Sequence, residues 1–156
     1  MTHKFKESLA RVVGDTPERA RLNTILELNG YTFTWYDDDM AKQAAGVDLE
    51  FSKNGHTYKA DWKLRHKNYL DFLAEIDSHS AHGWLDKSTA QITHIIYQLP
   101  DHIYLIDWHK LRARYLKRRA HWLLCYPEIE VENEGYFSRN ICVPWSEIRR
   151  CWSKLV

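Results

Sequence analysis

The chain is poor in cysteine, glycine and proline, and it contains no long apolar run. Its three cysteines are widely spaced and form no CxxC pair, so we expect a reduced protein without structural disulfides. No run of 18 apolar residues occurs, so no helical membrane span is expected. The opening segment MTHKFKESLARVVGD lacks the apolar core and cleavage site of a secretory signal. These absences together predict a cytoplasmic protein.

Several motifs of common enzyme classes are also missing. There is no Gly-rich phosphate loop, no GxSxG elbow and no dinucleotide fingerprint, which argues against kinases, serine hydrolases and Rossmann enzymes. The formal net charge is only +1, so any contact with nucleic acid must come from local basic patches. A hydrophobic content of 44% without internal repeats or linkers predicts one globular domain that spans residues 1–156.

The first half of the chain carries clear signals for a helix followed by strands. Thr16 or Asp15 is a suitable N-cap, Pro17 suits the first helical turn, and Asn29-Gly30 is a stop signal. The pair Asn54-Gly55 tolerates the positive φ angles of a type I′ turn and predicts a β-hairpin. The expected elements are a helix from 17 to 28, a strand over 31–36, and hairpin strands over 47–52 and 57–64.

The second half reads as further strands and helices. Residues 69–76 alternate imperfectly, and a strand is favoured there over a helix. The remaining expectations are strands over 91–99 and 102–108, a basic amphipathic helix over 111–122, an acidic turn over 128–134, a short strand over 140–143, and a final helix from about 146. This order predicts an α/β (α+β) sandwich with a central mixed β-sheet flanked by helices.

The predicted hairpin brings two carboxylates and a lysine to one end of a sheet. Asp61 and Lys63 are two residues apart on a strand, so they face the same side while Trp62 faces the other layer. Asp48 lies at the head of the preceding strand. Two carboxylates and the backbone carbonyl of Trp62 are hard oxygen ligands of the kind that Mg²⁺ prefers. Lys63 is placed to assist an attacking water or to stabilise the charge of a phosphoryl transition state.

A fourth acidic group is expected near this site. Glu27 is the first candidate, because a helix packed on the sheet is able to present it there. Glu75, on the following strand, is the alternative and is a weaker candidate for the metal.

The residues Asp48, Asp61 and Lys63 in this context resemble the PD-(D/E)xK nuclease superfamily, which has the restriction-endonuclease-like fold. Val47 stands where that motif carries its proline. The segments GWLDKS (83–88) and IYLIDWHKLR (103–112) are similar to small phage-type members. The resemblance implies a Mg²⁺-dependent deoxyribonuclease, with Mn²⁺ as a substitute, acting on DNA as a homodimer, in the host cytoplasm if the protein is phage-encoded.

Basic side chains near the hairpin and on the predicted helix are candidates for contacts with the DNA backbone. They are Lys59, Arg65, Lys110, Arg112, Arg114, Lys117, Arg118 and Arg119. A non-catalytic DNA- or protein-binding module with the same fold is the alternative function. A zinc site built on His79 and His82, with Cys125, Cys142 or Asp86, is a weaker alternative because paired ligands are missing.

Overall fold

The computed structural model describes residues 16–78, 81–83, 85, 91–133 and 136–156. The helices are α2 (Pro17–Leu28), α3 (Met40–Ala44), α4 (Trp108–Cys125) and the 3₁₀ helix η1 (Trp145–Cys151). The strands are β1 (Thr32–Trp35), β2 (Leu49–Lys53), β3 (His56–Leu64), β4 (Asp71–Ser78), β5 (Ala81–His82), β6 (His94–Gln98), β7 (Ile103–Asp107), β8 (Glu128–Asn133), β9 (Tyr136–Pro144) and β10 (Trp152–Lys154).

The strands form two sheets. The larger one has six strands in the order β1-β2-β3-β6-β7-β10, and its pairs are antiparallel except for the parallel pair of β3 and β6. The smaller one has four antiparallel strands in the order β5-β4-β9-β8. The protein is therefore a mixed α/β structure with a central mixed sheet, as the sequence predicted.

Local sequence explains the bounds of the first elements. The hydroxyl of Thr16 accepts a hydrogen bond from the backbone of Arg19 at 3.2 Å, which caps α2. Asn54 and Gly55 adopt φ angles of 52° and 78°, as a type I′ turn requires, and they join β2 to β3. Both the helix and the hairpin lie where the sequence placed them.

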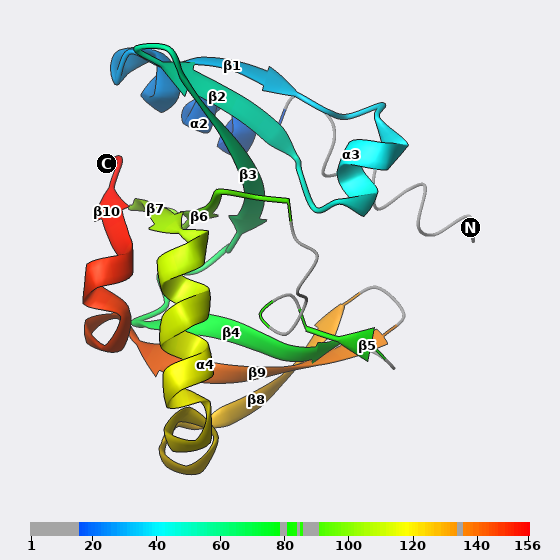
Figure 1. The fold of residues 1–156 in the computed structure, drawn as a ribbon, viewed down its shortest axis with the longest axis vertical. Helices are drawn as coiled ribbons and strands as arrows, with labels where there is room; N and C mark the ends of the chain where they lie inside the picture. The colour runs from blue at the N-terminus through cyan, green and yellow to red at the C-terminus, as the bar shows by residue number, and fades with distance from the viewer. Residues whose placement is uncertain (1–15, 79–80, 84, 86–90, 134–135) are drawn as a thin grey trace.

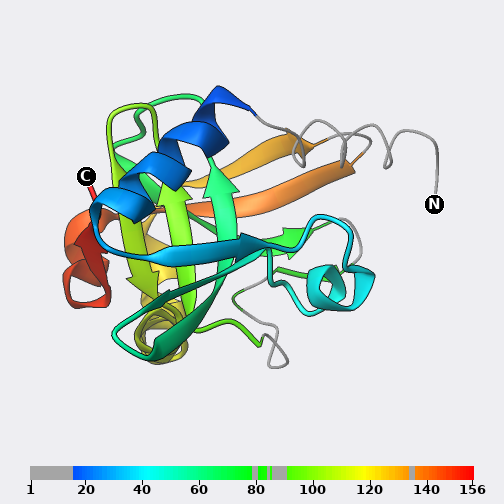
Figure 2. The same ribbon diagram turned by 90° about the horizontal axis from the view of Figure 1, so that it is seen from above.

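Two apolar cores lie on opposite faces of the large sheet. Helix α2 covers one face, where Leu22 and Leu26 pack with Leu49, Ala60 and Trp62. Figure 2 shows this helix lying across the strands. On the other face the small sheet and α4 complete the second core (Figure 1). That face is covered by a sheet and a helix together, where the sequence predicted helices.

The second half of the chain departs from expectation in two places. The predicted acidic turn at 128–134 is wrong, because most of it forms β8, which pairs with β9. The expected final helix is a seven-residue 3₁₀ helix, and β10 follows it at the edge of the large sheet. The preferred strand at 69–76 is confirmed as β4. None of the helices in the described ranges has the length and apolar character needed to cross a membrane.

Candidate active site

Asp48 is fixed between two neighbouring strands, just before β2 begins. Its backbone N–H donates to the carbonyl of Ala60 at 2.8 Å, and its own carbonyl accepts from the backbone of Tyr36 at 2.9 Å. Its side-chain Oδ2 accepts a third hydrogen bond, of 2.7 Å, from the backbone N–H of Trp62. Asp48 is thus held against β3 at the level of the Asp61-Trp62-Lys63 triplet.

Asp61 and Lys63 point from β3 toward the second core. Their register partners on β6 are Ile95 and Tyr97, which both belong to that core. Lys63 Nζ lies 2.9 Å from Asp61 Oδ2, and their side chains are 26% and 15% exposed. The pair is therefore sheltered but open to small solutes, as a metal and substrate site requires.

The two carboxylates interact strongly. The pKa of Asp48 is raised from 3.8 to about 7: burial is the largest cause, the charge of Asp61 adds to it, and the hydrogen bond from the Trp62 N–H acts in the opposite direction. Burial alone would lower the pKa of Lys63, but the carboxylates of Asp61, Asp48 and Glu75 outweigh it and raise the value. A cationic lysine thus faces a crowded acidic pair that a divalent ion is suited to neutralise.

Trp62 contributes through its backbone. Its side chain packs in the α2 core, where its indole N–H donates to Gln98 Oε1 at 2.9 Å. Backbone groups of successive residues in β3 point alternately to its two neighbouring strands. The carbonyl of Ala60 and the N–H of Trp62 point toward Asp48. The carbonyl of Lys59 and the N–H of Arg65 point to the β6 side. This alternation directs the Trp62 carbonyl toward Asp48 as well, where it is placed to act as a third oxygen ligand.

The structure distinguishes the two candidates for the fourth acidic group. Glu75 lies on β4 within electrostatic reach of Lys63, whose pKa its charge raises. It sits at a β-bulge between Glu75 and Asp77, a feature that re-aims side chains near active sites. Glu27 is exposed in the last turn of α2, on the helix that covers the opposite face. Three residues further along, the open side of Gly30 faces the Lys53 side chain near the hairpin tip, so the structure does not bring Glu27 to the site.

One acidic residue on β2, the strand that follows Asp48, is absent from the sequence prediction. Glu50 faces the same side as Asp48, two residues along the extended chain, and pairs in register with Lys59. Its carboxylate lies 3.4 Å from Lys42 Nζ, and its hydrogen bond with the Tyr36 hydroxyl raises the pKa of that phenol. The period of two along the strand was the signal that could have identified Glu50.

The predicted basic contacts fall into two groups. Lys59 and Arg65 lie on the Asp61 face of β3, and the Arg65 Nε donates to the Tyr97 hydroxyl at 3.2 Å. On α4, Lys110 and Lys117 are exposed.

The arginines of α4 are partly committed to packing. Arg114 and Arg118 form ion pairs with Glu147 of η1, at 3.3 and 2.9 Å, and Arg119 Nε donates to the Tyr115 hydroxyl. Arg112 is partly buried. Arg114 and Arg118 dock η1 onto α4, so their side chains are less available to DNA than expected.

The donor set suits a hard cation that retains substrate and water ligands. Among the described residues no group of three or more His, Cys, Asp or Glu side chains is gathered as a metal site. Mg²⁺ commonly uses one or two carboxylates together with phosphate and water, which the Asp48–Asp61 pair and the Trp62 carbonyl fit. For the zinc alternative, His79 and Asp86 lie outside the described residues, as does most of the GWLDKS segment, and Cys125 is exposed on α4.

Comparisons with protein-family models, with curated proteins and with solved structures gave no match. The site therefore has to be interpreted from its own geometry.

Proposed function

We propose that the protein is a Mg²⁺-dependent deoxyribonuclease of the PD-(D/E)xK type. The observation that carries the proposal is the convergence of Asp48, Asp61 and Lys63, with the Lys63 ammonium 2.9 Å from Asp61 and the Trp62 N–H on Asp48. A carboxylate whose pKa is raised by burial and by a neighbouring carboxylate, with a lysine beside the pair, is typical of a metal-dependent phosphodiesterase site.

The arrangement of strands supports the same proposal. Helix α2, the antiparallel meander β1-β2-β3 and the parallel strand β6 follow the order of the restriction-endonuclease-like core. In this chain the connection from β3 to β6 contains β4 and β5, where that core has a helix. The small sheet then occupies the face that the helix would cover.

The residues of the site have separable roles in this proposal. Asp48, Asp61 and the Trp62 carbonyl would hold Mg²⁺, which supplies Lewis-acid stabilisation of the phosphate and a more acidic water. Lys63 orients the attacking water and stabilises negative charge as it develops on the phosphate. The charge of Glu75 adds to those of Asp61 and Asp48 in favouring the protonated form of Lys63, and Lys59 and Arg65 extend positive charge along the same face of β3 for the DNA backbone.

The test is a cleavage assay with supercoiled, linear and single-stranded DNA in Mg²⁺, Mn²⁺ or EDTA. Wild type is compared with Asp61→Asn and with Glu132→Gln, an exposed carboxylate on β8 that serves as the matched control. Metal-dependent cutting that is lost only in Asp61→Asn, with unchanged circular dichroism, supports the nuclease. Folded wild-type protein that cuts none of these substrates in either metal would refute it and favour a binding module. Homodimerisation stays a prediction, which light scattering of the purified chain tests.

A further inference from the structure

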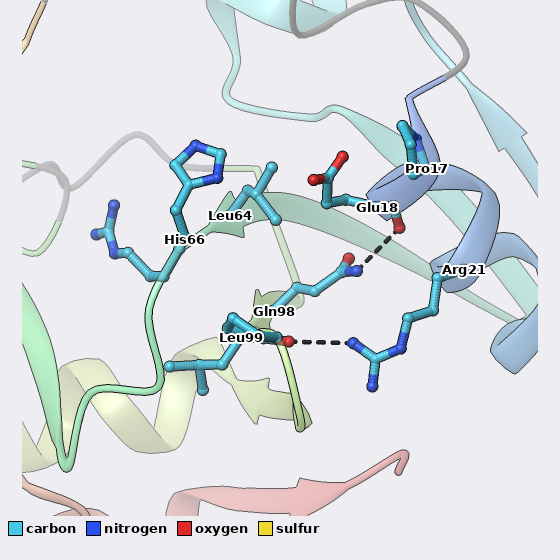
Figure 3. A pocket seen from close by; sticks show the side chains of 9 residues that line it. Pro17, Glu18, Arg21, Leu64, His66, Gln98 and Leu99 are labelled. Carbon is cyan, nitrogen blue, oxygen red and sulfur yellow. Dashed lines mark hydrogen bonds between the residues drawn. The ribbon is translucent and has the colours of Figure 1, made fainter.

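A separate pocket opens where β3 and β6 end, on the α2 side of the large sheet. It has a volume of about 270 Å³, and its walls come from the first turn of α2, the end of β3 and the loop after β6. Leu64 and Arg65, which directly follow Lys63, belong to its lining. Figure 3 shows Glu18 and His66 extending on opposite sides of the hollow, with Leu64 and Gln98 between them.

Internal hydrogen bonds hold the pocket in shape. Gln98 is 1% exposed, and its amide both accepts from the Trp62 indole and donates to the Glu18 carbonyl at 2.9 Å. The Arg21 guanidinium donates to the carbonyl of Leu99 at 3.1 Å. The pocket is therefore formed before any ligand binds, as small-molecule sites usually are.

The chemistry of the lining suits a flat heterocycle better than an anion alone. Leu64, Leu99 and the prolines at 17 and 100 offer apolar surface, while Arg21 and His66 offer donors. The Glu18 carboxylate would repel a bare phosphate but accepts hydrogen bonds from the amino and imino groups of a base.

Position links the pocket to the substrate. The pocket lies on the α2 side of the large sheet, opposite to the Lys63 side chain, but its lining includes Arg65, which shares the face of Lys63. The rise along a strand is about 3.3 Å per residue, so Arg65 lies about 7 Å from Lys63 along the chain, which is roughly the length of one nucleotide. We infer that this pocket holds an unpaired nucleotide of the DNA beside the scissile phosphate, so that the enzyme prefers DNA with a flap or frayed end. The inference rests on the proposed function.

The preference for DNA with an unpaired flap is measured by fluorescence anisotropy. The binding buffer contains EDTA, so that the proposed cleavage does not proceed. The probes are a blunt DNA duplex and the same duplex with a short unpaired flap. Base stacking and pocket contacts are expected to favour the flap at least about fivefold. His66→Ala and Arg21→Ala are expected to remove most of this preference and to change the affinity for the blunt duplex by less than about twofold. Arg150→Ala, an exposed arginine of η1, is the control and should leave the preference unchanged.

Equal binding of both probes by wild type overturns the inference, as does a preference that survives both variants. His66 is exposed, so its variant stays informative even if Arg21→Ala weakens the fold, which thermal melting checks. Asp61-dependent cleavage without any flap preference would overturn the pocket assignment and leave the nuclease standing. A folded protein that neither cuts nor binds any DNA would overturn both.

Discussion

The raised pKa of Asp48 makes a quantitative prediction about stability. A proton affinity ten times higher corresponds to about 1.4 kcal/mol. A rise from 3.8 to about 7 therefore makes the ionised carboxylate about 4 kcal/mol less favourable in the folded chain than in the unfolded one. Because the folded state binds this proton more tightly, the contribution of Asp48 to wild-type stability is most favourable below about pH 4 and becomes less favourable as the pH rises from about 4 to about 7.

Asp48→Asn removes the charge but keeps an oxygen that accepts the Trp62 N–H. We expect the variant to be more stable than wild type by at most about 4 kcal/mol at pH 8, and by less than about 1 kcal/mol at pH 4. Urea unfolding in EDTA at the two pH values measures this difference. Mg²⁺ at pH 8 should stabilise wild type but not the variant, because a bound cation stabilises the folded state only where its ligands are present.

Glu132→Gln, at an exposed carboxylate, is the control and should show no comparable pH-dependent gain. A stability difference between Asp48→Asn and wild type that is the same at pH 4 and pH 8 would refute the reasoning. So would a destabilised variant at pH 8. Either result would mean that Asp48 is not a costly buried charge kept for function.

Three further predictions concern other charged groups. Lys63→Met should lower the cleavage rate by at least about 100-fold, and an unchanged rate would contradict the role given to Lys63. The same variant should raise the pKa of Asp48 further, which NMR titration of the Asp48 carboxyl detects. Glu75→Gln should reduce the rate by about tenfold and Glu27→Gln should not, so initial rates that rank them the other way would contradict the placement of both residues. Glu147→Gln should destabilise the fold by about 3 kcal/mol at pH 7. Burial raises the pKa of Glu147, but hydrogen bonds from Trp122, Arg118 and Tyr126 outweigh burial and lower the pKa to about 2. The stabilisation by the ionised Glu147 is therefore present above pH 4.5 and is lost as the pH falls toward 2, which urea unfolding at pH 7 and pH 3 measures.

Local sequence signals were sufficient to predict features that are formed by residues close together in the chain. The Asn54-Gly55 turn fixed the register of β2 against β3, and with it the approach of Asp48 to Asp61. The face of β3 that carries Lys63 followed from the alternation of a strand. These features needed no information from distant parts of the chain.

Features that depend on distant pairing were not predicted. The segment Glu128–Asn133 alternates acidic and apolar residues, but it becomes a strand only because β9 lies beside it. Glu27 was misplaced for a related reason: a helical pattern does not say which end of the helix lies over which end of the sheet. The bulge that accompanies Glu75 likewise depends on the pairing of β4 with β9.

The pairing of β4 with β9 also bears on how the chain reaches its folded state during synthesis. The two strands are separated by β5, β6, β7, the whole of α4 and β8. A nascent chain therefore exposes the unpaired apolar edge of β4 until β9 has left the ribosome, while the hairpin of the site is already able to form. Substitutions in β8 and β9 should consequently reduce the yield of folded protein through aggregation, and the molecules that do fold should keep an intact site.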